Sequence, residues 1–283
     1  MQTQQEKAKA FRDLHHQDRA FIIPNPFDVG SARILAHLGF AALATTSAGY
    51  AFTLGLQDGA VGRDLMLKHA AEIASATDLP VSADLENGFG DDPKTVAETI
   101  RLAAAAGLCG GSIEDVSPRP EGRIYEISHA ADRIRAAAEA ARALPFPFVL
   151  TARAENFLVG RPNLKDTIMR LQAYQAAGAD VLYAPGLTGK ADIAEVVRSV
   201  DRPVNVIMGL QGVQLTLAEL SSLGVKRVSI GSALSRAALG AFLRAAREMC
   251  DHGSFRFADQ AVPYKEISAL FGRRPKSSRA SRS

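Results

Sequence analysis

Two carboxylates, Asp84 and Glu86, close an apolar segment just before a glycine turn. Side chains at i and i+2 of a strand share a face, so we expect both acids to point the same way. Two further apolar segments end in Glu114 and in Arg153. Carboxylate oxygens are the ligands that Mg²⁺ prefers, with Mn²⁺ as an alternative. The pattern therefore predicts a metal site built from Asp84, Glu86 and Glu114.

The residues around these acids predict an anionic substrate. A guanidinium can hold a carboxylate through two parallel hydrogen bonds, and backbone N–H groups in a turn can bind an anionic oxygen. A metal that chelates a 2-oxo acid would stabilise the enolate formed when a neighbouring bond breaks. The simpler alternative is that the acids and the arginine form only structural ion pairs. The residues that we expect to contact the substrate are Ser47, Ala48, Gly49, Tyr50, Arg153 and Asn205.

The elements that would position these residues alternate between strand and helix along most of the chain. Several expected helices end at a glycine shortly before the next strand, as helix C-caps do: Gly39, Gly107, Gly178 and Gly224. The strand segments are short and continuously apolar, which is typical of strands buried on both faces. Eight units over about 230 residues predict an α/β protein with a (β/α)8 TIM barrel. The expected strands cover residues 21–24, 41–44, 80–84, 111–114, 148–153, 180–184, 203–207 and 227–230.

A doubly wound open sheet is the main alternative fold, but it usually carries a glycine-rich phosphate turn after its first strand. Here the first strand leads into Asn-Pro-Phe-Asp at residues 25–28. We also expect an N-terminal helix over residues 3–16 and an extra C-terminal helix over residues 262–270. Residues 1–270 are predicted to form one domain, followed by a disordered basic tail at residues 271–283.

Composition excludes several classes of protein. The chain has 283 residues and a formal net charge of only +3, which shrinks further once the basic C-terminal tail is set aside, so no nucleic-acid footprint is visible. No apolar run approaches the roughly 20 residues needed to span a membrane. The polar N-terminus lacks the apolar stretch of a signal peptide. The two cysteines, Cys109 and Cys250, show no metal or redox spacing. These features predict a cytoplasmic protein with a small-molecule substrate.

Several segments, in this order, resemble the isocitrate lyase/phosphoenolpyruvate mutase superfamily. They lie at residues 25–33, 46–49, 83–90, 112–115 and 151–153. The resemblance implies a Mg²⁺-dependent barrel that acts on 2-oxo acids, or on acids cleaved to them, through enolate chemistry. It also implies a homo-oligomer, a tetramer or a dimer, in which subunits exchange a C-terminal helix.

The resemblance also assigns roles to individual residues. Asp84 and Glu86 match an Asp-x-Asp motif whose first acid is the main metal ligand, although glutamate replaces the second aspartate here. Glu114 matches an acid at the end of the fourth strand, and Arg153 matches an arginine that binds a substrate carboxylate. Asp58, in the loop after the second strand, matches a further acid near the metal. On this basis we expect Asp58, Glu114 and Arg153 to act in catalysis.

The segment over residues 116–125 departs from the superfamily pattern. Lyases of the superfamily carry a Lys-Lys-Cys-Gly-His-like motif there, whereas this segment has neither cysteine nor histidine. Without that cysteine, the proton donor would come from Tyr50, Tyr125, Tyr183 or water.

Three hypotheses follow for the activity. The first is a Mg²⁺-dependent lyase that cleaves a C–C bond of a small 2-hydroxy or 2-oxo dicarboxylate through an enolpyruvate-like intermediate. The second is a C–P mutase or hydrolase, with Arg119 and Arg123 engaging a phosphonyl group. The third is a barrel that binds a metabolite without catalysis.

Overall fold

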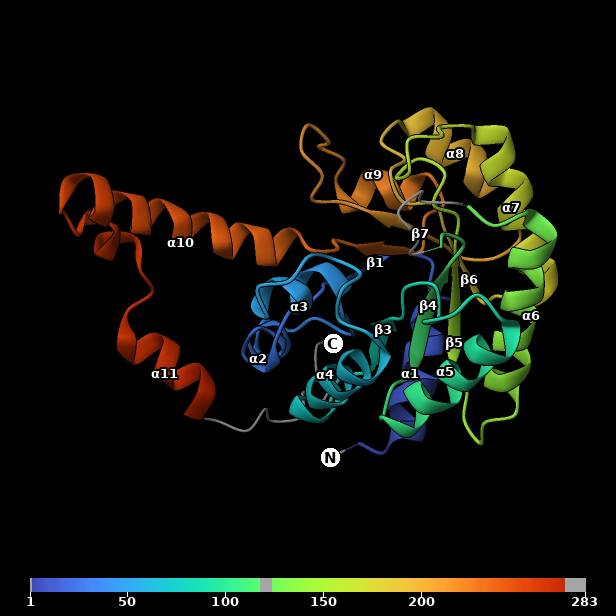
Figure 1. The fold of residues 1–283 in the computed structure, drawn as a ribbon, viewed down its shortest axis with the longest axis horizontal. Helices are drawn as coiled ribbons and strands as arrows, with labels where there is room; N and C mark the ends of the chain where they lie inside the picture. Colours follow the sequence, from blue (N-terminus) through green and yellow to red (C-terminus); the bar gives the residue numbers. More distant parts are fainter. Residues whose placement is uncertain (1, 118–123, 273–283) are drawn as a thin grey trace.

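Eight parallel strands form one nearly closed sheet in the computed structural model, which describes residues 2–117 and 124–272 (Figure 1). Each strand from β2 to β8 pairs with its neighbour in sequence, and β8 pairs in parallel with β1. The backbone N–H of Ala44 donates to the carbonyl of Pro24 at 3.1 Å, which joins the remaining edges. This confirms the predicted barrel. The strands are β1 Phe21–Ile23, β2 Leu43–Ala44, β3 Val81–Asp84, β4 Gly110–Glu114, β5 Val149–Arg153, β6 Val181–Tyr183, β7 Val204–Ile207 and β8 Arg227–Ser229.

Helices follow the strands and begin and end at the residues that sequence rules favour. Asp28 caps α2 by accepting a hydrogen bond from the Ser31 N–H at 2.6 Å, and Gly178 ends α7 in the left-handed region at φ 108°. The helices are α1 Gln4–Leu14, α2 Val29–His37, α3 Ser47–Thr53, α4 Arg63–Ala76, α5 Pro93–Ala105, α6 Ile127–Arg142, α7 Leu164–Ala177, α8 Lys190–Arg198, α9 Leu217–Ser222, α10 Ala233–His252, the 3₁₀ helix η1 Arg256–Gln260 and α11 Tyr264–Gly272.

Two apolar layers hold the barrel together. The larger lies between the strands and the surrounding helices, and small alanine side chains let α5 and α6 pack closely. The smaller lies inside the barrel at the amino ends of the strands, where Phe11 of α1 meets Phe21, Val149 and Val181. A Cβ on Gly110 would lie 2.6 Å from the carbonyl oxygen of Val149 and 2.9 Å from the Phe11 ring. Glycine at residue 110 therefore allows α1 to close this end of the barrel.

The C-terminal helices leave the barrel as an arm (Figure 1). Helix α10 projects away from the body, and α11 returns to pack beside α2. The backbone carbonyl of Phe271 accepts a hydrogen bond from Arg33 Nη2 at 2.8 Å. Helix α11 thus continues through the first two residues of the predicted tail, and residues 273–283 lie outside the described residues. Within residues 2–117 and 124–272, no helix is both long and apolar enough to cross a membrane.

Candidate active site

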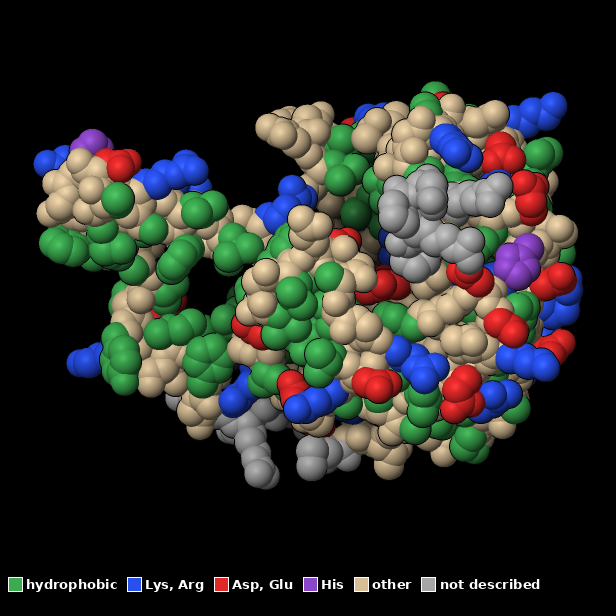
Figure 2. All heavy atoms as spheres, viewed as in Figure 1, with side chains coloured by type: hydrophobic (Ala, Val, Ile, Leu, Met, Phe, Trp, Pro, Cys, Tyr) green, Lys and Arg blue, Asp and Glu red, His purple; other side chains and the backbone are tan. Residues whose placement is uncertain are grey.

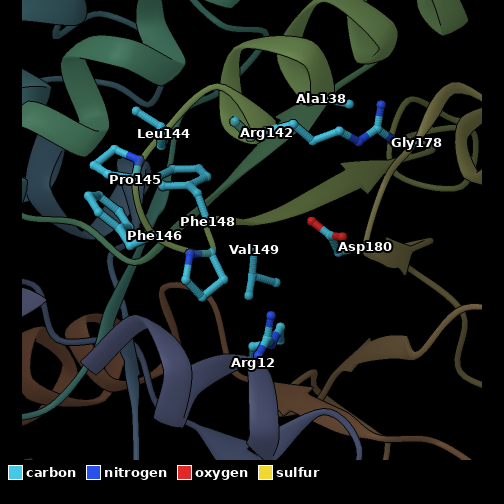
Figure 3. Close-up of a pocket in the computed structure, with 12 residues that line it drawn as sticks. Arg12, Ala138, Arg142, Leu144, Pro145, Phe146, Phe148, Val149, Gly178 and Asp180 are labelled. Carbon is cyan, nitrogen blue, oxygen red and sulfur yellow. The ribbon is translucent and has the colours of Figure 1, made fainter. Parts of the chain in front are cut away.

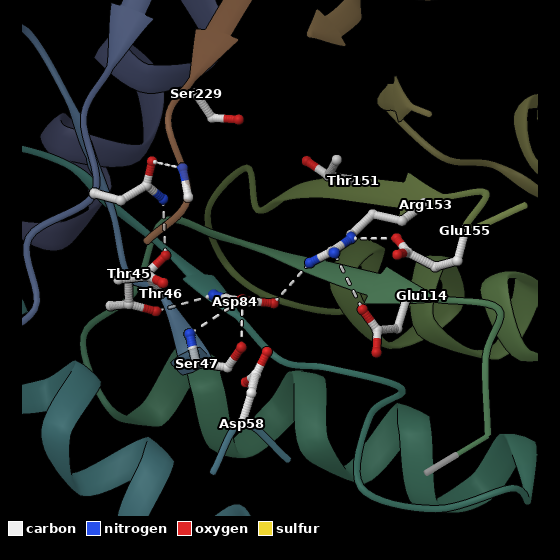
Figure 4. A network of polar contacts seen from close by, with 12 residues as sticks. Thr45, Thr46, Ser47, Asp58, Asp84, Glu114, Thr151, Arg153, Glu155 and Ser229 are labelled. Atoms are coloured by element: carbon white, nitrogen blue, oxygen red, sulfur yellow. Dashed lines mark hydrogen bonds and ion pairs between the residues drawn. The ribbon is translucent and has the colours of Figure 1, made fainter. Parts of the chain in front are cut away.

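Arg153 lies at the centre of a group of carboxylates at the carboxyl ends of β3, β4 and β5 (Figure 4). Its Nη1 lies 2.9 Å from Asp84 Oδ1, and its Nη2 lies 3.2 Å from Glu114 Oε2. Its Nε lies 2.8 Å from Glu155 Oε1. All four side chains are largely buried. The structure therefore brings Asp84, Glu114 and Arg153 together, as neighbouring strand ends predict.

Glu155 lies with Arg153 at the end of the fifth strand segment of the sequence, but no role is predicted for it. Its side chain is only 4% exposed, and its carboxylate forms an ion pair with Nε of Arg153. The signal that could have found it is its position two residues after Arg153, the same spacing that led to Asp84 and Glu86.

The turn after β2 binds Asp84. The Ser47 N–H and Ser47 Oγ both donate to Asp84 Oδ2, at 3.1 and 2.9 Å, and the Gly49 N–H donates to Thr46 Oγ1 at 3.2 Å. Two of the backbone N–H groups expected to hold an anionic oxygen therefore bind oxygens of the protein in this structure. The turn positions the first carboxylate as well as lining the site.

Glu86 reaches the site by a route that differs from the expected one. Strand β3 ends at Asp84, and Glu86 lies in the left-handed region at φ 49°, so strand alternation does not place its side chain. Its Oε1 is buried without a hydrogen-bond partner among the described residues. Burial, and then the charges of Asp84 and Asp58, raise the pKa of Glu86 to about 7.

Negative charge is in excess at this site. Burial raises the pKa of Glu114 well above its usual value, against the attraction of Arg153. Partial burial also raises the pKa of Asp58, and Asp84 adds to the rise. A single guanidinium thus faces Asp84, Glu114 and Glu155 directly, while Asp58 and Glu86 lie close enough to repel Asp84.

This donor set fits a hard divalent cation. It is rich in carboxylate oxygen, carries excess negative charge and contains the unpartnered Oε1 of Glu86. Within the described residues, however, no three His, Cys, Asp or Glu side chains already stand in a metal-binding arrangement. Both oxygens of Asp84 are instead held, one by Arg153 and the other by Ser47. A metal would therefore have to take over contacts that these two residues now make.

A cavity of about 190 Å³ opens beside the acids, and the predicted residues that line it are Ser47, Ala48, Asp58, Asp84, Arg153 and Asn205. Tyr50 instead stacks on His69 of α4, with ring centroids 3.7 Å apart. Tyr183 lines the cavity, and its ring centroid lies 5.2 Å from the Arg153 guanidinium carbon. The Tyr125 hydroxyl donates to Asp91 at 2.5 Å. Of the three tyrosines proposed as proton donors, Tyr183 is therefore the one that lines this cavity among the described residues.

Sequence reasoning missed the polar residues deeper in the same cavity. They are Thr45, Ser82, Ser112, Arg227 and Ser229, which come from β3, β4, β8 and the end of β2. Single serine or arginine residues within apolar strands gave no local signal that they face the barrel interior.

A larger cavity of about 430 Å³ lies at the amino end of β5, between α1 and α6 (Figure 3). Arg12, Arg142 and Asp180 line it, together with phenylalanine and proline side chains. None of the clustered acids reaches it, so we assign the candidate active site to the smaller cavity.

Two parts of the predictions lie outside the described residues. The first is most of the segment over residues 116–125, which includes Arg119 and Arg123. The second is the tail from residue 273. The described ends of the segment meet at an isolated antiparallel bridge between Val116 and Ile124.

The sequence of this chain also matches a known protein family. The sequence model of the phosphoenolpyruvate phosphomutase family matches residues 11–250. The chain belongs to this family. The match confirms the superfamily resemblance found in the sequence.

Relatives of this family member act on small carboxylates according to their names. A 2-methylisocitrate lyase of Escherichia coli (strain K12) is 31% identical over 69% of this chain and 68% of its own length. A crystal structure of a candidate lyase/mutase from Burkholderia cenocepacia J2315 has a TM-score of 0.94 and 62% identity, and covers 95% of this chain and 98% of its own. Oxaloacetate acetylhydrolase in complex with the product oxalate has a TM-score of 0.84 and 26% identity, and covers 96% of each chain. This family member is therefore an enzyme of the lyase and mutase type.

Proposed function

We propose that this protein is a Mg²⁺-dependent lyase that cleaves a C–C bond of a small 2-hydroxy or 2-oxo dicarboxylate through an enolpyruvate-like intermediate. The observation that carries the proposal is the convergence of Asp84, Glu114 and Arg153 beside a cavity of about 190 Å³. Two relatives named for methylisocitrate cleavage and oxaloacetate hydrolysis support the choice of a C–C bond.

Asp84, Glu86 and Glu114 are the residues that would hold the metal, with Asp58 beside them. When bound, Mg²⁺ supplies Lewis-acid stabilisation of the oxygen on which negative charge develops. Arg153 keeps Asp84 and Glu114 in place and offsets their charge. A guanidinium has five N–H donors, and the three contacts described above leave two that can bind a substrate carboxylate. Ser47 orients Asp84 from the opposite side.

The test is the Mg²⁺ dependence of turnover over a panel of 2-hydroxy and 2-oxo dicarboxylates. Asp84→Asn is expected to lower kcat/KM by about 100-fold or more and to weaken Mg²⁺ binding measured by calorimetry. Asp64→Asn is the matched control, because the Asp64 side chain is 96% exposed on α4. Turnover and Mg²⁺ binding that are unchanged in Asp84→Asn would refute the proposal.

Cleavage or rearrangement of a C–P bond is the second candidate, because the matching family is described as a phosphoenolpyruvate phosphomutase family. Phosphonopyruvate in the same panel separates the two reactions. Phosphate release or phosphoenolpyruvate formation without dicarboxylate cleavage would favour C–P chemistry. Tight oxalate binding with no turnover of any compound would favour a barrel that binds without catalysis.

We also propose that a second copy of this chain covers the α10 arm. Of the 20 residues of α10, only Ser235 is buried, and Phe242 and Leu243 are 68% and 50% exposed. Hydrophobic side chains gather along α10 and α11 in Figure 2. Most of the stability of a helix in a protein comes from packing of its apolar face, so the arm needs a packing partner. A second copy is always present at equal concentration and would make the enzyme a dimer or tetramer.

A further inference from the structure

Arg227 is a buried cation in the cavity wall, below the carboxylate group. It begins β8, is only 5% exposed and lines the same cavity as Asp84 and Arg153. Burial lowers its pKa to about 10, which still leaves the guanidinium charged at neutral pH.

All of its hydrogen-bond partners are neutral. Arg227 Nε donates to Asn205 Oδ1 at 2.9 Å, and Arg227 Nη2 donates to Thr151 Oγ1 at 2.9 Å. Its Nη1 lies 3.4 Å from His15 Nε2. Within residues 2–117 and 124–272, no carboxylate forms an ion pair with Arg227.

His15 is held in the form that accepts from Arg227. His15 Nδ1 lies 2.8 Å from the Phe11 carbonyl oxygen, which can only accept, so Nδ1 carries the proton. Burial, and then the charge of Arg227, lower the pKa of His15 to about 3, so the ring is neutral. The lone pair of Nε2 therefore faces the guanidinium. Because the His15 ring is neutral, it does not neutralise the charge of Arg227.

An isolated buried charge is costly unless an opposite charge offsets it. Three neutral acceptors satisfy three of the five guanidinium N–H donors and leave the charge without a counter-ion. Small residues, Ala44, Ser82 and Ser112, line the same cavity. A cavity with space, hydroxyl groups and an unneutralised guanidinium is suited to one small anion.

We propose that the inner end of this cavity is a binding site for a single small anionic group, held by Arg227 with Thr151 and Asn205 beside it. The anionic group is either a carboxylate of a bound substrate or a free inorganic anion such as a halide. The site does not depend on the proposed lyase reaction, because it requires neither Mg²⁺ nor turnover.

Bromide locates the site in the wild-type enzyme. Crystals soaked in sodium bromide are expected to show an anomalous peak in contact with the Arg227 guanidinium. In solution, bromide is expected to raise the Tm in a saturable way relative to gluconate at constant ionic strength, because a ligand of the folded state stabilises it. A peak without a saturable Tm response would be binding at crystal concentration only and would overturn the proposal, as would no peak at Arg227.

A variant assigns the solution response to Arg227. Arg227→Met keeps an unbranched side chain but removes the charge and is expected to need at least about tenfold more bromide for half of the Tm rise. Arg198→Met is the control, because Arg198 lies on α8 with its side chain 66% exposed. A response that is equal in wild type and Arg227→Met would refute the role of Arg227. If Arg227→Met does not fold, the proposal is tested by the wild-type protein alone, which must show both the bromide peak at Arg227 and the saturable rise in Tm.

Malonate and succinate distinguish the two sources of the anion. If they remove the bromide peak and raise the Tm of wild type but not of Arg227→Met, the site takes a substrate carboxylate. If they leave the bromide peak in place, the site takes a free inorganic anion. Neither the bromide peak nor the Tm response requires Mg²⁺. A negative result for the anion site is therefore distinguishable from a negative result for the proposed lyase, which would be unchanged turnover in Asp84→Asn.

Discussion

At the scale of single residues, the buried carboxylate of Asp115 has a structural task. Asp115 directly follows β4 and is only 2% exposed. Its Oδ1 accepts from the Glu155 N–H at 2.9 Å, and its Oδ2 accepts from Tyr174 at 2.5 Å and from Arg170 at 3.1 Å. Asp115 thus ties the end of β4 to α7 and positions the backbone that carries Glu155.

Asp115→Asn should destabilise the protein strongly. The amide removes the negative charge and leaves the buried Arg170 guanidinium without this partner, which costs about 3–5 kcal/mol in comparable cases. Urea unfolding measures the change in free energy of unfolding. Asp166→Asn is the control, because Asp166 also binds Arg170 but is 29% exposed. Equal effects of the two substitutions would contradict this account of Asp115.

At the scale of elements, α1 closes the barrel end opposite the acids. Phe11 packs among Phe21, Val149 and Val181, and His15 at the end of α1 reaches Arg227. The Phe11 and Phe21 rings both lie edge-on to the His15 imidazole. Because the imidazole is enclosed by aromatic rings and faces a cation, the folded state favours its neutral form.

Protonation of His15 should couple folding to pH. Its folded-state pKa, about 3, lies below the unfolded value of about 6.5, so the unfolded chain takes up the proton first as pH falls. Stability is therefore complete above about pH 6.5 and is lost as pH falls toward 3, with a limiting slope of about 1.4 kcal/mol per pH unit. The neighbouring charges are Arg227 and His16, which both oppose the protonated form.

His15→Gln is expected to flatten this slope, measured as the free energy of unfolding between pH 7 and pH 5. Glutamine can still accept from Arg227 but takes up no proton in this range. His37→Gln, at the exposed end of α2, is the matched control and should leave the slope unchanged. A slope that is the same in wild type and His15→Gln would show that His15 is not the titrating group.

At the scale of the whole molecule, the barrel and the α10 arm differ in how they are buried. The barrel has a continuous apolar core, whereas α10 extends from the body and touches it mainly through the ends of the arm (Figures 1 and 2). Exposed apolar side chains on the arm include Leu239, Phe242, Leu243 and Met249. Surfaces of this kind in a folded protein mark an interface, which supports the proposed self-association.

Phe242→Glu should shift the mass measured by light scattering from an oligomer to a monomer, because a charge would be buried in the interface. Met169→Glu is the control: Met169 is 44% exposed, and it lies on α7, on the other side of the barrel from the arm (Figure 1). A wild-type protein that is monomeric at all concentrations would contradict the proposed interface.

Local sequence patterns were enough to predict the barrel and the residues at the carboxyl ends of its strands. Strand segments, helix-ending glycines and the placement of Asp84, Glu114 and Arg153 at strand ends depend on local patterns of apolar residues, which are readable along one chain. The carboxyl ends of parallel strands meet on one face, so these three residues could be predicted to approach one another.

The contacts that these residues make could not be predicted from local patterns. The three carboxylates around Arg153, the engagement of Ser47 with Asp84 and the left-handed backbone at Glu86 depend on contacts between segments distant in sequence. The placement of Arg227 beneath the site likewise depends on the pairing of β8 with β1 and β7 and on the register between these strands. Hydrophobic periodicity specifies which face of an element is buried, but the register between strands decides which polar side chains meet.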